Sequence, residues 1–379
     1  MMRRLGAWLA LLIVSGCGGP GVKEAQDPPS VELERSNAGV EEQWRARVGS
    51  AGGLHHRLEP VLSGERVYAA GANGTLVAFE AATGDTVWRR RLEDRRLSGG
   101  PSVTDGVLAI GTRDGGLLGL AAENGEQRWQ ADVSSELLAP PAVGQGAVVT
   151  RTNDGRVFAI DAEEGEQRWL YDRRVPPLTL RGHSSPVLVR GGVLVGFDNG
   201  SLVALKLSDG SEAWEATVAL PSGGTDIERM VDVDGDPRVG GSQVFATSYQ
   251  GRVVGLGLGD GQVAWTRDIS SSKGPALDGD KVYISASNGK IWALDRNNGA
   301  TVWQQEALNG LQLTAPRRYG DHVLVGGSDG YLYWLSPDDG RLVARRRVGD
   351  ERIVAPPVTS DGWLYVQTAG GALVALKQD

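Results

Sequence analysis

Residues 154–169 read DGRVFAIDAEEGEQRW, and this phrase recurs along the chain with a regularity that decides the fold. Six further copies align with it: 73–88 NGTLVAFEAATGDTVW, 114–129 DGGLLGLAAENGEQRW, 199–214 NGSLVALKLSDGSEAW, 250–265 QGRVVGLGLGDGQVAW, 288–303 NGKIWALDRNNGATVW and 329–344 DGYLYWLSPDDGRLVA. Every copy but the last ends in tryptophan, and these tryptophans stand 38 to 51 residues apart. A shortened eighth copy, 370–376 GGALVAL, follows near the C-terminus. A period of this length is typical of repeat architectures.

Each copy predicts two turns and two strands. The pair Asn73-Gly74 favours a type I′ hairpin turn, because both central residues of that turn need a positive φ. The apolar run 76–79 that follows suits a strand buried between neighbouring sheets. A second turn at Thr83-Gly84 leads to the strand of Trp88. With a further turn and an apolar pair upstream, such as Val107-Leu108, each repeat of about 40 residues supplies the four strands of a propeller blade.

Two positions of the repeat indicate how blades pack. The middle of the apolar run holds a small residue, which we expect to let neighbouring sheets approach closely; these residues are Ala78, Gly119, Ala159, Ala204, Gly255 and Ala293. The final tryptophan is expected to dock into the adjacent blade. The seventh copy departs at both positions, with Trp334 in place of the small residue and Ala344 in place of the tryptophan.

The missing last strand of the eighth repeat is found at the other end of the chain. Residues 40–44, VEEQW, carry the pattern of the tryptophan strand 44 residues before Trp88. The sequence therefore predicts an all-β fold over residues 39–379, an eight-bladed propeller of four-stranded blades whose ring is closed by an N-terminal strand. Closure of this kind removes the exposed sheet edges that promote aggregation.

Composition excludes several classes of protein. The chain has 379 residues, 55 of them glycine, and a formal net charge of −8, so it offers no electrostatic reason to bind nucleic acid. Its one cysteine, Cys17, excludes an internal disulfide and a structural zinc site built on several cysteines.

The first 38 residues predict a targeting signal followed by a flexible tether. Arg3 and Arg4 precede a short apolar run that suits a signal peptide over residues 1–16 and is too short to span a bilayer. The run ends in Val14-Ser15-Gly16-Cys17, which resembles a bacterial lipobox; the resemblance implies that Cys17 becomes the lipidated, palmitate-bearing first residue of the mature protein. Gly18, rather than an aspartate, follows it, and the resemblance to sorted lipoproteins implies the outer membrane over the inner membrane. Residues 17–38 have little apolar content and are expected to form a flexible tether.

The repeat resembles that of pyrroloquinoline-quinone-type propellers, whose enzymes bind their quinone on the propeller axis with calcium. Those enzymes are longer and carry an adjacent cysteine pair, which this chain lacks. The run 232–236, DVDGD, begins like a calcium loop, but Pro237 and Gln243 stand where the turn glycine and the bidentate glutamate belong. His183 and His322 stand alone, and His55 and His56 are adjacent, so they would face opposite ways on a strand. We therefore expect no catalytic residue, no cofactor and no metal site.

Two stretches outside the repeat resemble the outer-membrane protein assembly factor B family, the propeller lipoproteins of the β-barrel assembly machinery. Residues 178–182, LTLRG, resemble that family's L-x-L-R-G connection, and residues 228–234, ERMVDVD, resemble its E/D-R-x-x-D-V-D insertion. The resemblance implies contact with the main barrel subunit. The partner-binding residues implied are Leu178, Leu180, Arg181, Asp232 and Asp234. The alternative is that Leu178 and Leu180 only cap a blade edge.

The resulting expectation is a non-enzymatic scaffold lipoprotein on the periplasmic face of the outer membrane. It would assist the insertion and folding of outer-membrane proteins by binding the main barrel subunit, and unfolded outer-membrane proteins are further candidate partners. The alternative function is a periplasmic quinoprotein-type dehydrogenase or a ligand-sensing propeller.

Overall fold

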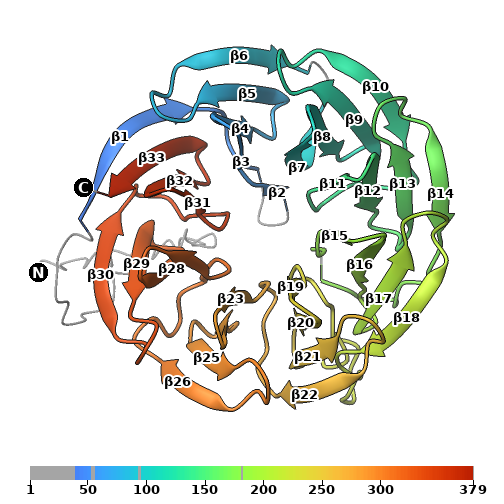
Figure 1. Cartoon of the computed structure of the whole chain (residues 1–379), viewed down its shortest axis with the longest axis vertical. Coiled ribbons are helices and arrows are strands. Elements are labelled where there is room, and N and C mark those ends of the chain that lie inside the picture. Colours follow the sequence, from blue (N-terminus) through green and yellow to red (C-terminus); the bar gives the residue numbers. More distant parts are fainter. Residues whose placement is uncertain (1–38, 53–55, 93–94, 181, 379) are drawn as a thin grey trace, which may run out of the picture.

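The structure is a computed structural model that describes residues 39–52, 56–92, 95–180 and 182–378. The described residues form 33 strands and no helix, arranged as eight sheets around a central axis (Figure 1). No segment within these ranges is a helix with the length and apolar character needed to cross a bilayer. The predicted all-β, eight-bladed propeller is confirmed.

Blades 1 to 4 follow one another along the chain, each running from an innermost to an outermost strand. Blade 1 consists of β3 (Val61–Ser63), β4 (Arg66–Ala70), β5 (Thr75–Glu80) and β6 (Thr86–Arg91). Blade 2 consists of β7 (Leu97–Thr104), β8 (Val107–Thr112), β9 (Gly116–Ala121) and β10 (Gln127–Asp132). Blade 3 consists of β11 (Ala142–Gly144), β12 (Ala147–Arg151), β13 (Val157–Asp161) and β14 (Gln167–Tyr171). Blade 4 consists of β15 (Val187–Val189), β16 (Gly192–Gly196), β17 (Ser201–Lys206) and β18 (Glu212–Thr217).

Blades 5 to 7 repeat this order, and blade 8 combines the two ends of the chain. Blade 5 consists of β19 (Arg238–Gly240), β20 (Gln243–Thr247), β21 (Val253–Gly257) and β22 (Val263–Arg267). Blade 6 consists of β23 (Ala276–Asp278), β24 (Lys281–Ser285), β25 (Ile291–Asp295) and β26 (Thr301–Gln305). Blade 7 consists of β27 (Arg317–Tyr319), β28 (His322–Gly326), β29 (Tyr331–Leu335) and β30 (Leu342–Arg347). Blade 8 consists of β31 (Val358–Ser360), β32 (Trp363–Gln367), β33 (Ala372–Gln378) and β1 (Val40–Arg47).

Ring closure occurs as predicted. Strand β1 pairs antiparallel with β33 along its whole length, and Trp44 lies opposite Ala375. Figure 1 shows β1 lying along the outside of the ring between β30 and β6. The described strands therefore form a continuous circle of blades.

Tryptophans join successive blades by a repeated contact. The indole N–H of each outer-strand tryptophan donates a hydrogen bond to a main-chain carbonyl of the next blade, at 2.8–3.0 Å; the pairs are Trp44–Ala81, Trp88–Ala122, Trp129–Ala162, Trp169–Leu207, Trp214–Leu258, Trp265–Arg296 and Trp303–Pro337. The ring lies against a turn glycine of that blade. At Gly125, which has a φ of 72°, a Cβ would lie 2.7 Å from Trp88 Cε3. The predicted docking of the tryptophans is thus present, and glycine leaves room for it.

The small residue in mid-strand has a different purpose from the one expected. It lies directly opposite the tryptophan of its own blade, as Gly119 lies opposite Trp129. A Cβ on Gly119 would lie 2.0 Å from Trp129 Cε2. The small residue therefore makes room for a ring within the same sheet rather than for a neighbouring sheet.

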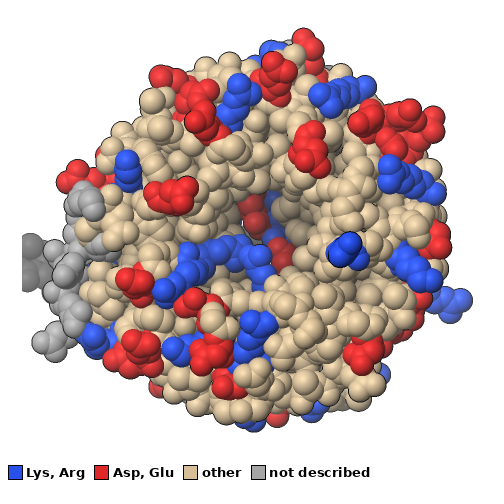
Figure 2. Space-filling view, in the orientation of Figure 1, with Lys and Arg blue, Asp and Glu red and all other residues tan. Residues whose placement is uncertain are grey.

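The ring is hollow at its centre, and acidic and basic side chains gather at the opening (Figure 2). The short strand β2 (Arg57–Leu58) follows β1 in the sequence and pairs in parallel with β7, the innermost strand of blade 2, near the axis (Figure 1). The segment after the ring-closing strand β1 therefore lies on the channel side of the blades.

Candidate partner-binding site

Two long connections between blades form the candidate site. Residues 172–186 join β14 to β15, and we call them the 3–4 connection; residues 218–237 join β18 to β19, and we call them the 4–5 connection. Each runs from the outermost strand of one blade to the innermost strand of the next. Equivalent connections emerge on the same face of a propeller, so these two are neighbours.

Aspartates of the 4–5 connection bind main-chain amides of the 3–4 connection. The N–H of Leu180 donates to Asp232 Oδ1 at 3.0 Å, and the N–H of Ser185 donates to Asp236 Oδ1 at 2.6 Å. Asp236 is held in turn by Arg57, whose two terminal nitrogens donate to its two carboxylate oxygens at 2.7 and 2.8 Å. These hydrogen bonds fix the two connections to each other and to β2.

The predicted site residues occupy two levels. Leu178 is 43% exposed and Leu180 is half-buried. Asp232 is fully buried and Asp234 is 8% exposed, so both carboxylates lie beneath the surface rather than on it. Arg181 and Cys17 lie outside the described residues. The structure thus brings Leu180 and Asp232 together and leaves Leu178 at the surface above.

Exposed apolar side chains concentrate on the two connections. Within the described ranges seven large apolar residues are exposed, and four of them belong to these connections: Val175, Leu178, Leu220 and Ile227. Leu220 is 75% exposed and Ile227 is 63% exposed. A concentration of exposed apolar side chains on one face marks a surface that contacts other molecules. The sequence analysis identified Leu178 and missed the other three.

A local turn presents Ile227. The N–H of Glu228 donates to Thr225 Oγ1, and Glu228 Oε2 accepts from the N–H groups of Gly224 and Thr225. This reciprocal pair is the capping-box arrangement that stabilises the start of a helical turn. The main-chain donors lower the pKa of Glu228, which keeps the carboxylate charged and the turn closed. The exposed side chain of Ile227 therefore projects from a hydrogen-bonded turn.

A buried ionic cluster lies behind the connections. Arg151 Nη2 donates to Asp198 Oδ1 at 2.7 Å, and neither side chain is exposed. His183 Nδ1 lies 3.5 Å from the same Asp198 oxygen. Asp232 and Asp234 complete the cluster, since their charges and that of Asp198 act on one another. Three carboxylates therefore share a buried volume with one guanidinium.

The cluster shifts the pKa values of its members in opposite directions. Burial raises the pKa of Asp232 to about 7, and the charge of Asp198 adds to this. Burial and the charges of Asp232 and Asp198 raise the pKa of Asp234 well above its usual range. Burial also opposes the ionisation of Asp198, but Arg151 outweighs it and lowers the pKa to about 2. Burial and the charge of Arg151 lower the pKa of His183, so its imidazole is neutral at neutral pH.

Sequence reasoning missed this cluster, although the repeat carries a signal for it. Arg151 occupies the second-strand position that pairs with the start of the third strand, where most blades have a small residue, as with Ala70, Gly111 and Gly196. His183 stands alone in the sequence, and Asp198 belongs to a hairpin turn of another blade. Departures from the repeat at equivalent positions, rather than local motifs, would have pointed to these residues.

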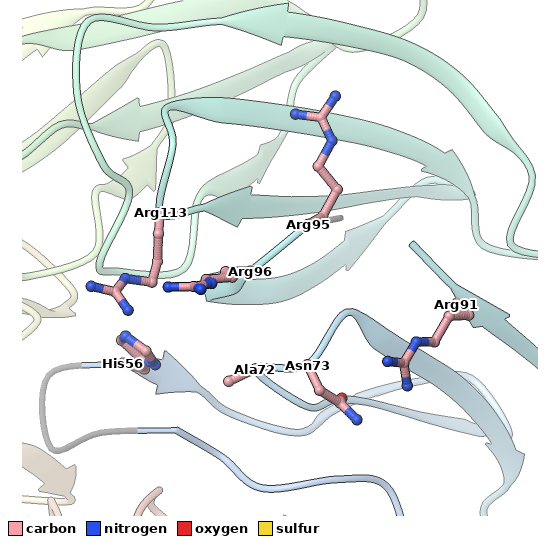
Figure 3. Close-up of a pocket in the computed structure, with 7 residues that line it drawn as sticks. All are labelled: His56, Ala72, Asn73, Arg91, Arg95, Arg96 and Arg113. Atoms are coloured by element: carbon pink, nitrogen blue, oxygen red, sulfur yellow. The ribbon is translucent and has the colours of Figure 1, made fainter. Parts of the chain in front are cut away.

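Blades 1 and 2 carry a basic pocket of about 570 Å³. It is lined by His56, Ala72, Asn73, Arg91, Arg95, Arg96 and Arg113 (Figure 3). Arg96, Arg113 and His56 point toward one another, whereas Arg95 points away and binds Asp114 and Gln130. None of the lining residues is a carboxylate, so the pocket favours an anionic group.

Comparisons with known proteins agree with this architecture over nearly the whole chain. A family model described as outer membrane protein assembly factor BamB matches residues 35–96, 82–305 and 309–379. A curated protein of Alkalilimnicola ehrlichii with the same description is 44% identical over 376 residues, which cover 99% of this chain and 97% of that protein. The crystal structure of BamB from Moraxella catarrhalis superimposes with a TM-score of 0.83 at 27% identity, covering 89% of this chain and 99% of that one.

A more distant likeness concerns the fold alone. The quinohemoprotein alcohol dehydrogenase of Comamonas testosteroni superimposes with a TM-score of 0.72 at 15% identity, covering 89% of this chain and 76% of that one. At such an identity the shared ring shape carries no information about activity.

Proposed function

Since this chain belongs to the family of the outer membrane protein assembly factor BamB, we propose that it works as a non-enzymatic scaffold of the outer-membrane β-barrel assembly machinery and docks on the main barrel subunit through its 3–4 and 4–5 connections. The observation that carries this proposal is local. The two connections are bound to each other and hold four of the seven exposed large apolar residues of the described chain.

The proposed contact divides the work between surface and interior. Leu178 and Ile227 would supply apolar area, and burying one such side chain fully contributes about 1.5–3 kcal/mol. Arg181 would set the orientation of the partner. Asp232 and Asp234 would act from beneath, because Asp232 fixes the main chain of Leu180 and neither carboxylate reaches the surface.

The family supports only a coarse statement about the location of the protein in the cell. The family name places the protein in outer-membrane assembly. We further propose that residues 1–16 are removed as a signal peptide, that Cys17 carries the lipid anchor, and that residues 17–38 tether the propeller of residues 39–379 to the periplasmic face. Unfolded outer-membrane proteins are a second proposed class of partner.

The dehydrogenase alternative is not favoured, because the family match concerns assembly factors over nearly the full chain, whereas the likeness to dehydrogenases concerns ring shape.

Co-purification from solubilised outer membranes tests the proposal. A tagged full chain should retrieve the barrel assembly subunits in stoichiometric amount. Retrieval of bound quinone without those subunits would overturn the scaffold and support the enzyme.

A further inference from the structure

Three side chains behind the connections offer metal-ligand atoms to one another. One ligand atom each from His183, Asp198 and Asp234 lies within 4.8 Å of the other two. All three residues are at least nine-tenths buried. They come from the 3–4 connection, from the hairpin turn between β16 and β17, and from the 4–5 connection, so blade 4 and both of its flanking connections contribute.

The orientation of His183 is that of a metal ligand. Its Nε2 lies 2.9 Å from Asn153 Oδ1, and because an amide oxygen only accepts, we assign the proton of the neutral imidazole to Nε2. Nδ1 then carries a lone pair, and it faces a carboxylate oxygen of Asp198 at 3.5 Å. Metal-binding histidines are oriented in this way by an acceptor on their other nitrogen. Two acceptors that face each other in a buried place are stabilised by a cation between them.

Several other polar atoms around this point have no hydrogen-bond partner within the described chain. They are Asp198 Oδ2, Asp232 Oδ2, Asp234 Oδ1, Ser184 Oγ and His183 Nδ1, together with the donors Arg151 Nε and Nη1, all buried. Arg151 occupies only the Oδ1 atom of Asp198, which leaves Oδ2 available. A buried polar atom without a partner costs about 1–3 kcal/mol, so this concentration needs a physical explanation.

Charge points the same way. Arg151 balances the charge of Asp198, whereas the buried Asp234 has an Oδ1 atom with no hydrogen-bond partner in the described chain. A divalent cation bound between these carboxylates would give Asp234 a partner of opposite charge. We propose that His183, Asp198 and Asp234 bind a divalent transition-metal cation of the Zn²⁺ type at the junction of the 3–4 and 4–5 connections.

The donor set selects the class of metal. One imidazole nitrogen and carboxylate oxygens are ligands of Zn²⁺ and its first-row neighbours, whereas Ca²⁺ and Mg²⁺ prefer oxygen alone. Bonds of about 2.0–2.2 Å place tetrahedral ligand atoms roughly 3.4 Å apart, so binding draws the three side chains inward by about 1 Å. Three protein ligands leave a fourth coordination position for water.

The cation would join the two connections at a second point. His183 and Asp234 belong to different connections, and the metal would add a bond between them to the hydrogen bonds of Asp232 and Asp236. The metal would therefore hold the two connections, which carry the exposed side chains of Leu178 and Leu220, in one arrangement.

The test is a titration of the full chain, stripped with EDTA, with ZnCl₂ by isothermal titration calorimetry at neutral pH. We expect one saturable site per chain. His183→Gln and Asp234→Asn should weaken its affinity roughly 100-fold, and Asn153→Ala, which removes the acceptor that orients the imidazole, about tenfold. His322→Gln in blade 7 is the matched control and should keep wild-type affinity. Zn²⁺ should also raise the thermal midpoint of the wild type and of the control but not of His183→Gln.

Two results would overturn the proposal. One is a wild-type chain with no saturable Zn²⁺ site, which would mean that protons alone neutralise the carboxylates. The other is undiminished binding by both Asn153→Ala and His183→Gln, which would mean adventitious binding elsewhere on the surface. If circular dichroism shows that His183→Gln does not fold, the Asn153→Ala titration and the Co²⁺ absorption spectrum of the wild type test the proposal instead. Tetrahedral Co²⁺ with nitrogen and oxygen ligands gives intense visible bands. The wild type and the control His322→Gln should both show these bands. A wild-type Co²⁺ spectrum without those bands counts against the site. None of these readouts depends on the partner.

Discussion

Trp334 on β29 lies directly opposite Ala344 on β30, the reverse of the order in the other blades, where the small residue is on the third strand and the tryptophan on the outermost. The reason lies in blade 8. An outer-strand tryptophan docks against the turn that joins the last two strands of the next blade, and in blade 8 those strands are β33 and β1, which no turn connects. Trp334 instead fills the interface between blades 7 and 8.

The exchange predicts an asymmetric pair of mutations. Trp334→Ala should lower the free energy of unfolding by about 3–5 kcal/mol, as expected for a buried aromatic residue. Adding Ala344→Trp should not restore it, because the new ring has no turn glycine to dock against. Denaturant unfolding of the single and double variants measures this. A double variant as stable as the wild type would show that our account of the exchange is wrong.

Ring closure makes Trp44 equivalent to an internal tryptophan. Trp44 and Trp214 are both 9% exposed and both donate to a carbonyl of the next blade at 2.9 Å. Trp44→Ala should therefore destabilise the propeller about as much as Trp214→Ala, by about 3–5 kcal/mol. Thermal unfolding compares the two. A near-neutral Trp44→Ala beside a damaging Trp214→Ala would mean that β1 is dispensable for closure.

The proposed partner surface predicts a loss of binding without a loss of fold. Leu178→Glu combined with Ile227→Glu should weaken the binding free energy for the main barrel subunit by about 2 kcal/mol or more, and the amount of that subunit retrieved should fall accordingly. Val302→Glu on β26 is the matched control, because Val302 is 45% exposed and lies on another blade. Pull-down yield and circular dichroism are the measurements. Equal loss of yield in the control would remove the argument for this surface.

The bond between Asp232 and the Leu180 amide predicts local loosening. Asp232→Ala removes the acceptor at 3.0 Å, and amide exchange over residues 176–186 should accelerate about tenfold, as expected for a lost hydrogen bond of roughly 1.5 kcal/mol. Asp209→Ala is the control, since Asp209 accepts from Ser211 in an exposed turn. Hydrogen-exchange mass spectrometry reads both. Unchanged exchange in Asp232→Ala would assign the order of this connection to other contacts.

The proposed anchor predicts a change of location alone. Cys17→Ser should leave a folded propeller that is no longer acylated and no longer fractionates with the outer membrane, because Cys17 is the one cysteine of the sequence and the proposed acceptor of the lipid. Membrane fractionation with labelled palmitate measures this. Continued labelling of the variant in the outer-membrane fraction would exclude Cys17 as the acceptor.

The fold could be predicted from sequence because each blade repeats the same local physics. Turn glycines, an apolar run and a tryptophan recur, so one correct interpretation of residues 154–169 serves for the whole ring. The N-terminal strand was recognisable for the same reason, since Trp44 ends the same pattern. The purpose of Gly119 was not, because only the register of β9 and β10 shows that it faces Trp129.

The candidate site was only partly predictable. Leu178 and Asp232 stand in stretches that blade-building does not explain, and this marked them. That Leu178 is exposed and Asp232 is buried depends on how residues 218–237 pack against residues 172–186, and no local sequence pattern predicts this packing. Arg151 and Asp198 are 47 residues apart and meet only because successive blades lie side by side.

Closure by β1 also fixes an order of events in time. Strand β1 (Val40–Arg47) is synthesised long before its partner β33 (Ala372–Gln378), because the whole of the ring between them separates the two in sequence. Until β33 arrives, the hydrogen-bonding edge of β1 is unpaired, and the apolar surface that Trp44 shares with Tyr365 is incomplete. Contacts between residues so far apart in sequence form slowly and leave strand edges exposed meanwhile. A nascent chain of this protein therefore carries an unpaired strand edge at β1 until β33 has been synthesised and has paired with it.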